Sequence, residues 1–390
     1  MLPPEAADRI RALEPYMFAE LERKIAEKKA AGIDVISLGI GDPDWPTNPH
    51  IVAHAQSALE NPEHHQYPSN RGTERFRVAV EDFYDNRFGV ELDSATEIVP
   101  VLGAKEGIHN ICLAYLDHQD VALAADPGYP VYKTGPRLAG GDYVTMPLDP
   151  DIGFVPFLPD ISSEDRKRAK LMFLNYPNNP TGAMAPEGFF DEVVAFARDN
   201  DILVVHDASY TETTFDGKVA PSFLASPGAK EVGVEFFSLS KGFNMTGWRV
   251  GALVGNAEAV GNYHRLKTNI DSGMFGAVQA AGAEALETYA GVAAMNDVYV
   301  RRRDLVVDAL NRIGVQVEKP EATIYIWAPV PEGYNSASFA ERVLEESGVV
   351  VSPGSGFGEY GEGFFRISLT APDERIEEAV ERIGKMENIT

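Results

Sequence analysis

Short apolar runs that alternate with helical segments are the feature of this chain that most constrains its fold. Between residues 120 and 256 these runs are "DVALAAD", "KLMFLNY", "DILVVHD", "VEFFSLS" and "VGALVGN". Each is rich in branched or aromatic residues and continuous enough to be buried on both faces. Segment 187–201 has helical periodicity and places Phe189, Val193, Val194 and Phe196 toward one side. Strands that alternate with helices predict a mostly parallel α/β sheet.

The last hundred residues have a different pattern. Here "TIYIWAPV" and "FFRISLT" are separated by a charged helix and a glycine-rich loop, and "DERIEEAVERIGKM" reads as an amphipathic closing helix. We therefore expect a large domain over 46–285 and a smaller α+β domain over 286–390. Residues 1–45 are expected to form an N-terminal arm and part of the small domain.

Composition excludes some kinds of partner. The chain has 390 residues, is 44% hydrophobic and carries a net charge of -25. Such an acidic surface repels nucleic acid and anionic membranes. The single cysteine, Cys112, lies in an apolar run and is expected to be a core residue in a reducing compartment. The N-terminus has no apolar stretch of signal-peptide or membrane length, so we expect a cytoplasmic protein.

Four polar clusters lie at the ends of predicted strands, where open α/β sheets bind their ligands. They are "VLGAKEG" at 101–107, "NYPNNPTG" at 175–182, "VHDASY" at 205–210 and "SLSKGFNMTGWR" at 238–249. Each has a plain structural interpretation alone. The first could be an ordinary helix start, the second a turn, and the lysine of the last could reach the surface from a strand end.

Together the clusters indicate a chemical site. Free N–H groups of Gly103, Ala104 and Lys105 at a helix start could bind a phosphate. Asp207, at the end of a buried strand, needs a cationic or protonated partner. Lys241 in a dry pocket would be a nucleophilic amine that can form a Schiff base with a carbonyl. Pyridoxal phosphate carries an aldehyde, a pyridine nitrogen and a phosphate, so it fits all three groups.

In this order and spacing, "NYPNNPTG", "HDASY", "SLSKGFNMTGWR" and "FFRISLT" resemble the fold type I, class I aminotransferases. The likeness runs from about residue 16 to the C-terminus. It implies an α/β, aspartate-aminotransferase-like fold: a large domain with a mostly parallel seven-stranded sheet, plus a smaller α+β domain. It also implies pyridoxal 5'-phosphate, amino-acid and 2-oxo-acid substrates, no metal, and a homodimer with shared active sites.

The resemblance assigns roles to individual residues. Lys241 would form the Schiff base and then move the substrate's Cα proton, while Asp207 would pair with the pyridine nitrogen. Tyr210 and Asn179 would contact the phenolic oxygen, and Tyr129 would stack on the ring. Arg366 would bind the substrate α-carboxylate through two parallel bonds. The phosphate-binding set would comprise Gly103, Ala104, Lys105, Ser238, Ser240, Arg249 and Tyr67 from the neighbouring subunit.

Within that family, segments such as "LGIGDPDW" and "TNIDSGMF" most resemble LL-diaminopimelate aminotransferases. Those enzymes pass an amino group from LL-diaminopimelate to 2-oxoglutarate in lysine biosynthesis. The resemblance implies that Lys105 and Asn269 contact the distal end of the substrate, and that Ile40 and Gly41 also bind it. Asn70 and Arg71 stand where some members carry a glutamate for the distal ammonium. A broad-specificity aspartate or alanine aminotransferase is therefore the alternative.

Two further alternatives share the core motifs. One is a pyridoxal enzyme that eliminates or cyclises without transamination, such as a carbon–sulfur lyase. The other is a transcription regulator with an aminotransferase-like sensor domain. The acidic charge disfavours the regulator, and so does a chain that opens directly on the N-terminal arm.

Three other motifs favour ordinary structural roles. "GSGFGEYGEG" lacks dinucleotide-loop spacing and leads into a strand, so we expect a turn. His64 and His65 have no second ligand cluster nearby in the sequence, which disfavours a zinc site. The run Arg301, Arg302 and Arg303 is expected to lie on a solvated helix face or at a subunit contact.

Overall fold

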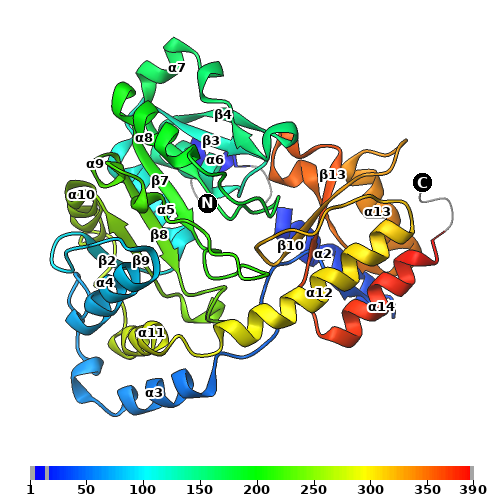
Figure 1. Ribbon diagram of the computed structural model, residues 1–390, viewed down its shortest axis with the longest axis horizontal. Helices are drawn as coiled ribbons and strands as arrows, with labels where there is room; N and C mark the ends of the chain where they lie inside the picture. The colour runs from blue at the N-terminus through cyan, green and yellow to red at the C-terminus, as the bar shows by residue number, and fades with distance from the viewer. Residues whose placement is uncertain (1–4, 14–16, 387–390) are drawn as a thin grey trace.

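The predicted strands assemble into one large, mostly parallel sheet in the computed structural model of the chain, which describes residues 5–13 and 17–386 (Figure 1). Residues 1–4 and 14–16 of the predicted N-terminal arm lie outside the described residues. In sheet order the strands are β2 (Ile98–Val101), β9 (Gly251–Gly255), β8 (Gly233–Ser238), β7 (Leu203–Ala208), β6 (Ala169–Leu174), β3 (Val121–Asp126), β4 (Asp142–Asp149) and β5 (Val155–Pro156).

The expected number of strands needs a small correction. The sheet has eight strands where seven were predicted, because the two-residue β5 pairs antiparallel with the end of β4. Strand β9 also runs antiparallel to both of its neighbours. The strands from β8 to β4 are parallel, as the alternation of apolar runs and helices predicts.

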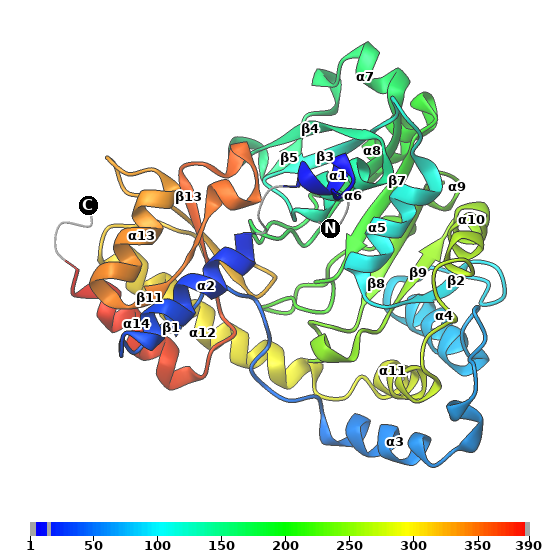
Figure 2. The ribbon, with the colours of Figure 1, turned by 180° about the vertical axis from the view of Figure 1, so that it is seen from behind.

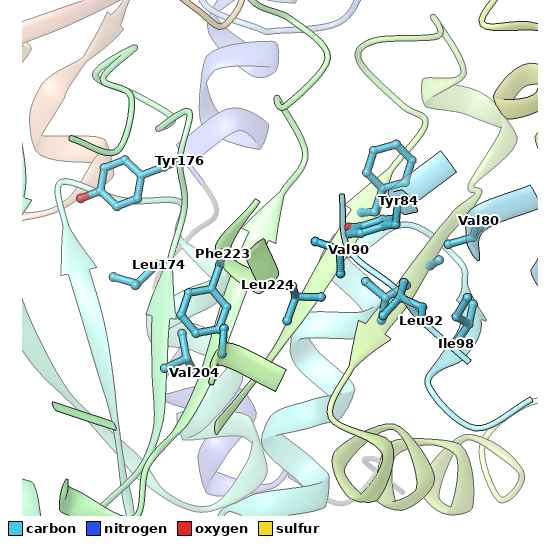
Figure 3. Close-up of a cluster of buried hydrophobic side chains, with 14 of the residues drawn as sticks. Val80, Tyr84, Val90, Leu92, Ile98, Leu174, Tyr176, Val204, Phe223 and Leu224 are labelled. Atoms are coloured by element: carbon cyan, nitrogen blue, oxygen red, sulfur yellow. The ribbon is translucent and has the colours of Figure 1, made fainter. Parts of the chain in front are cut away.

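Helices cover both faces of the large sheet. One face packs against α5 (Ala104–Tyr115), α6 (Val131–Ala139) and α10 (Ala257–Lys267). The other packs against α3 (Pro49–Leu59), α4 (Glu74–Phe88), α8 (Phe189–Asn200), α9 (Ala229–Val232) and α11 (Gly276–Thr288), and Figure 3 shows part of this core. In α8, the predicted Phe189, Val193 and Val194 are buried, whereas Phe196 is only partly buried. Burial on both faces explains why the strands lack a polar alternation.

The smaller part of the molecule lies beside the large sheet (Figures 1 and 2). Its strands form an antiparallel sheet and a short parallel pair: β10 (Tyr325–Pro329), β13 (Phe364–Ser368) and β12 (Ser352–Pro353), then β1 (Ile36–Ser37) and β11 (Val349–Val350). Its helices are α2 (Met17–Ala30), α12 (Val292–Arg312), α13 (Ser336–Ser347) and α14 (Asp373–Gly384). Ile376, Ala379 and Ile383 form the buried stripe of α14, as its amphipathic pattern predicts.

The remaining elements are short. They are α1 (Asp8–Arg11), α7 (Ser163–Arg168), and the 3-10 helices η1 (Pro62–His65), η2 (Pro150–Ile152), η3 (Leu158–Asp160), η4 (Phe223–Ala225), η5 (Thr246–Trp248), η6 (Gly354–Phe357) and η7 (Glu359–Gly361). The last two occupy the glycine-rich segment before β13, which was expected to be a turn and not a dinucleotide loop.

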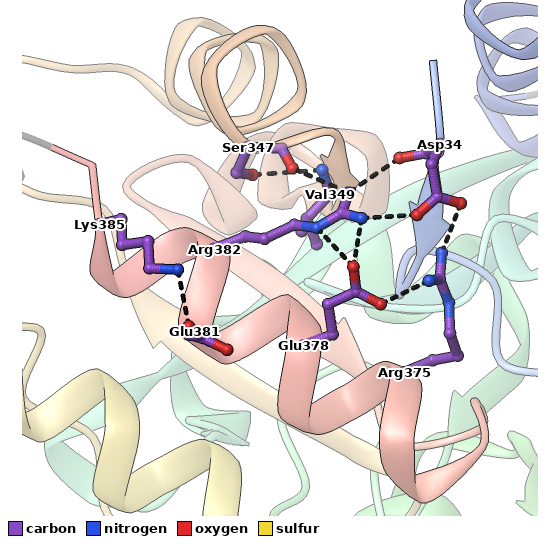
Figure 4. Close-up of polar contacts among 8 residues, drawn as sticks. All are labelled: Asp34, Ser347, Val349, Arg375, Glu378, Glu381, Arg382 and Lys385. Atoms are coloured by element: carbon purple, nitrogen blue, oxygen red, sulfur yellow. Dashed lines mark hydrogen bonds and ion pairs between the residues drawn. The ribbon is translucent and has the colours of Figure 1, made fainter. Parts of the chain in front are cut away.

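Ion pairs attach the N-terminal part of the chain to the last helix (Figure 4). Asp34, just before β1, accepts hydrogen bonds from Arg375 at 2.8 Å and from Arg382 at 2.5 Å, both in α14. Glu378 lies between the two arginines and bonds both. These contacts fix β1 beside α14, and so position the loop that follows β1.

One prediction about the arginine run is wrong. Arg301 is exposed, but Arg302 and Arg303 are each only 3% exposed. Arg302 forms ion pairs with Asp44 and Asp373, and Arg303 pairs with Asp216. Successive helical residues lie about 100° apart, so part of a basic run can point inward when acidic partners lie there.

Cys112 and the pair His64 and His65 make ordinary structural contacts. Cys112 is buried and its thiol donates to the carbonyl of Ile108 at 3.2 Å, and burial raises the pKa of that thiol. The rings of His64 and His65 bond the carbonyl oxygens of Ala58 and Leu59. Within the described residues, no helix is both long enough and apolar enough to span a bilayer.

Candidate active site

A cavity of about 350 Å³ lies where the carboxyl ends of β6, β7 and β8 meet the small part of the molecule. The large sheet contributes residues at or after the ends of β2, β3, β6, β7 and β8, and α2, β10, β13 and the loop after β1 contribute the rest. Most of the predicted site residues line this cavity: Ile40, Gly41, Ala104, Lys105, Tyr129, Asn179, Asp207, Tyr210, Ser238, Ser240, Lys241, Arg249 and Arg366. Clusters separated along the sequence thus converge on one space, as expected for strand ends of an open α/β sheet.

Lys241 lies three residues beyond the end of β8, and its side chain reaches into the cavity. Its Nζ donates a hydrogen bond to the carbonyl oxygen of Gly41 at 2.5 Å. Burial lowers the pKa of this amine; Tyr325 and Asp42 oppose the shift, and Arg366 and Arg249 add to it. More of the amine is therefore uncharged at neutral pH than in an ordinary lysine, which is what a nucleophile or base requires.

Asp207, near the end of β7, is 6% exposed and lines the cavity. Its carboxylate accepts hydrogen bonds from the Tyr132 hydroxyl at 2.8 Å and from the hydroxyl and backbone N–H of Ser209. Burial raises the pKa of Asp207, and these hydrogen bonds partly offset the rise. Among the described residues, no salt bridge joins Asp207 to a basic side chain, so a cation in the cavity would stabilise the carboxylate.

An anion-binding site surrounds the start of α5. Helix α5 begins at Ala104, and its N-cap Gly103 has a positive φ of 89°, which favours glycine. A Cβ at position 103 would lie 2.1 Å from a guanidinium nitrogen of Arg249, so only glycine allows this close approach. Arg249 bonds the carbonyls of Thr246 and Leu102, which holds its charge beside the helix N-terminus. Ser238 and Ser240 also line the cavity, and the helix N-terminus and the arginine together suit an anion.

Arg366 is only 1% exposed although it lines the cavity. Its guanidinium donates to the side-chain oxygen of Asn179 at 2.7 Å and to the carbonyl of Gly39 at 2.8 Å. Asn179 is held in turn, because its backbone N–H donates to the side chain of Asn175 at 2.7 Å. A fixed, planar guanidinium at the cavity wall is suited to a carboxylate ligand.

Two predicted residues of the cavity lining, Lys105 and Tyr129, lie near each other. The Nζ of Lys105 lies 5.8 Å from the ring centroid of Tyr129. Tyr129 packs edge-on against Tyr132, the residue that donates to Asp207. The Tyr129 ring is thus linked through Tyr132 to the Asp207 carboxylate.

The structure leaves three predicted residues outside the cavity lining. Gly103 acts through the conformation of the helix start. Tyr67 is 90% exposed, and the exposed Asn269 donates its side-chain amide to the Arg265 carbonyl. The loops that carry these last two residues touch, since a Cβ on Gly273 would lie 2.9 Å from the Ser69 carbonyl oxygen. Tyr67 and Asn269 therefore belong to neighbouring loops at the surface.

Sequence reasoning missed several residues that line the cavity, notably Asp42, Tyr132, Asn175, Ser209 and Tyr325. Four of them lie inside quoted segments or near a predicted site residue: Asp42 lies in "LGIGDPDW", Asn175 opens "NYPNNPTG", Ser209 precedes Tyr210, and Tyr132 lies three residues after Tyr129. Tyr325 had a weaker signal, because its strand was recognised only as an apolar run.

The donor set fits pyridoxal phosphate. The cavity brings together an amine with a lowered pKa, a buried carboxylate with no basic partner among the described residues, and an anion site at a helix N-terminus with an arginine. These three features match the aldehyde, the protonated pyridine nitrogen and the phosphate of the cofactor.

Comparison with known proteins gives one consistent result. The family model "Aminotransferase class I and II" matches residues 33–383. The chain is 54% identical to the LL-diaminopimelate aminotransferase of Moorella thermoacetica, with 98% of each chain covered. It is 55% identical to that of Desulforudis audaxviator, over 97% of this chain and 96% of the relative. The substrate-bound structure of BacF from Bacillus subtilis superposes with a TM-score of 0.94 at 35% identity, covering 98% of both chains. The chain thus belongs to the class I and II aminotransferases and has their aspartate-aminotransferase-like fold.

Proposed function

We propose that this pyridoxal-phosphate-dependent aminotransferase moves the amino group of LL-diaminopimelate to 2-oxoglutarate. The observation that carries the proposal is the convergence of Lys241, Asp207 and Arg366 on one cavity in a chain about half identical to enzymes of that name. At this identity, and with nearly full coverage, the substrate of those relatives is favoured over that of a broad-specificity aspartate or alanine enzyme.

When bound, pyridoxal phosphate supplies an aldehyde that captures the amino group and a ring that takes up electrons from the substrate Cα. Lys241 is the nucleophile that holds the cofactor and, once displaced by the substrate, the base that removes the Cα proton. Its lowered pKa serves both tasks, because both require the uncharged amine.

The other side chains bind and orient. Asp207 keeps the ring nitrogen protonated, and Tyr132 and Ser209 hold Asp207 in place. Tyr210 and Asn179 hold the phenolic oxygen, and Tyr129 covers the ring. Gly103, Ala104, Lys105, Ser238, Ser240 and Arg249 bind the phosphate.

Arg366 takes the α-carboxylate of each substrate. Its bonds to Asn179 and Gly39 fix the guanidinium plane before the substrate arrives, so less ordering entropy is lost on binding. Ile40 and Gly41 line the cavity and would contact the substrate, and Lys105, which also lines it, would meet a distal carboxylate.

The active form is proposed to be a homodimer. Tyr67 and Asn269 lie on touching surface loops, away from the cavity of their own chain. In the proposed homodimer they serve the site of the second copy, where Tyr67 would bind the phosphate and Asn269 the distal end of the substrate.

Single turnovers test the substrate. The holoenzyme is mixed separately with LL-diaminopimelate, aspartate, alanine and glutamate, and the cofactor spectrum is followed. We expect LL-diaminopimelate to convert the cofactor fully to pyridoxamine phosphate, and aspartate and alanine to do so far more slowly. Conversion by aspartate or alanine but not by LL-diaminopimelate would contradict the proposed donor. Formation of a 2-oxo acid without pyridoxamine phosphate would indicate a lyase instead.

A further inference from the structure

Tyr325 is a cavity residue to which no role has been assigned above. It lies at the start of β10, in the small part of the molecule, and is only 3% exposed. Its side chain nevertheless lines the cavity, among groups from both parts of the molecule. Two of these groups, Tyr210 and Arg366, contact it directly.

The hydroxyl of Tyr325 faces the cofactor side. Its oxygen lies 3.2 Å from the hydroxyl oxygen of Tyr210, within hydrogen-bond distance. The backbone of residue 41 passes so close that a Cβ on Gly41 would lie 2.0 Å from this oxygen. The same residue accepts the hydrogen bond from Lys241. The glycine therefore leaves the space in which the Tyr325 hydroxyl can reach Tyr210.

The ring of Tyr325 faces the substrate side. The guanidinium carbon of Arg366 lies 3.9 Å from the Tyr325 ring centroid and 4.5 Å from that of Phe357. The two aromatic rings hold the arginine while Asn179 and Gly39 accept its N–H groups. A guanidinium on an aromatic face gains a cation–π attraction, and its orientation decides whether a carboxylate can make two parallel bonds.

The charges around the hydroxyl agree with this placement. Burial alone raises the pKa of Tyr325, but Arg366, Lys241 and the hydrogen bond with Tyr210 outweigh it and lower that pKa. Burial raises the pKa of Tyr210, which favours its neutral hydroxyl. Either hydroxyl of the pair could donate, and when Tyr325 donates, the single O–H of Tyr210 remains available to the cofactor.

We propose that Tyr325 is a positioning residue that acts on two sides of the reaction: its hydroxyl orients Tyr210 toward the cofactor, and its ring orients Arg366 toward the substrate carboxylate. The proposal rests on the proposed function, since it assumes that Tyr210 meets the cofactor and Arg366 the substrate. It extends that function by assigning separate effects to two parts of one side chain.

Two substitutions separate these effects. Tyr325→Phe removes the hydroxyl and keeps the ring, whereas Tyr325→Leu removes both. Tyr299→Phe is the matched control, because Tyr299 is buried in the same core cluster and its hydroxyl has no hydrogen-bond partner among the described residues. Melting temperatures and the pyridoxal phosphate content of each variant are measured first.

The ring is tested by carboxylate binding without turnover. Glutarate, which has neither an amino nor a keto group, is titrated into each holoenzyme while the cofactor absorption band is followed. We expect Tyr325→Phe to bind glutarate within about two-fold of wild type and Tyr325→Leu to bind about ten-fold more weakly, because only the second loses the stack on Arg366. Equal weakening in both variants would overturn the assignment of the ring.

The hydroxyl is tested through Tyr210. We expect Tyr325→Phe to lower kcat about five-fold with little change in KM, and to shift the pH at which the cofactor band titrates. In a Tyr210→Phe background the same substitution should have almost no further effect, because the group it orients is gone. A full five-fold loss in that background, or a matching loss in Tyr299→Phe, would overturn the proposal.

The two proposals fail in distinguishable ways. A wild-type holoenzyme that forms no pyridoxamine phosphate with any amino donor contradicts the proposed function. The glutarate and absorption titrations need no turnover, so they report on Tyr325 separately. Should Tyr325→Leu fail to fold, the double-mutant cycle of Tyr210→Phe and Tyr325→Phe still decides the role of the hydroxyl.

Discussion

The cofactor side of the cavity is built from strand ends of the large sheet, whereas the residues expected at the far end of the substrate lie on two exposed loops. Asp207 is held by Tyr132 and Ser209 within a buried network. Tyr67, in contrast, is 90% exposed, and the side chain of Asn269 bonds the Arg265 carbonyl and its neighbour Thr268. The difference teaches that one chain gathers the groups for the chemistry, whereas the two exposed residues would complete a site only in the proposed homodimer.

The largest effect should come from removing the amine on the cofactor side. Lys241→Ala is expected to lower kcat by at least about a thousand-fold, because the nucleophile and the base are lost together. Cofactor content by absorbance and turnover with LL-diaminopimelate measure this. The anion site and Asp207 remain, so the variant should still bind some cofactor without a covalent bond. Near-normal turnover would show that Lys241 is not the reactive lysine.

A smaller effect is expected where the cavity meets the substrate carboxylate. Arg366→Lys keeps the charge but loses the planar pair of donors, so KM for both substrates should rise about ten- to a hundred-fold. Steady-state kinetics with each substrate varied in turn measures this. An unchanged KM with a reduced kcat would place the carboxylate elsewhere.

A single substitution in the exposed loops should have a smaller effect on cofactor binding and activity. Tyr67→Phe removes one hydroxyl proposed to reach the phosphate of the partner's site, so the cofactor should dissociate about ten-fold more readily. Equilibrium dialysis against pyridoxal phosphate measures the change. Val219→Ala, at another half-exposed surface position, serves as the control. A change of the same size in both variants would argue against the contact.

The smallest effect concerns stability without cofactor. Burial raises the pKa of Asp207, so the folded apo-protein binds a proton there more tightly than the unfolded chain. Its contribution to stability is therefore greatest below the unfolded pKa and is lost as pH rises through the folded pKa. Asp207→Asn should raise the apo-protein melting temperature relative to wild type by about 1 to 3 °C at pH 8 and less at pH 4. Calorimetry at both pH values checks this, and an equal difference at both would contradict it.

Much of the cofactor side could be predicted from the sequence because its residues lie in short motifs. Asp207 and Tyr210 share one motif, and Lys241 and Arg249 share another, so strand positions alone bring them to the same sheet edge. Tyr325 could not be predicted in this way. Its strand belongs to the small part of the molecule, and only folding places its hydroxyl beside Tyr210, 115 residues away along the chain.

The arginine run shows the same limit. Three consecutive basic residues resemble a solvated surface in the sequence, but the partner of Arg302, Asp44, lies 258 positions away. No local pattern signals that pairing. Asn269 is a further case. A resemblance in sequence does not distinguish a residue that lines the cavity of its own chain from one proposed to line the cavity of a second copy.

The most direct test of the two-part site is a mixed dimer. One subunit carries Lys241→Ala, and the other carries Tyr67→Ala with Asn269→Ala, so each homodimer lacks one half of every site. In the purified heterodimer, one site combines an intact cofactor side with intact loops from the partner. We expect that heterodimer to recover about half of the wild-type activity with LL-diaminopimelate, since one of its two sites is complete. Activity no higher than the mean of the two parent homodimers would contradict the account.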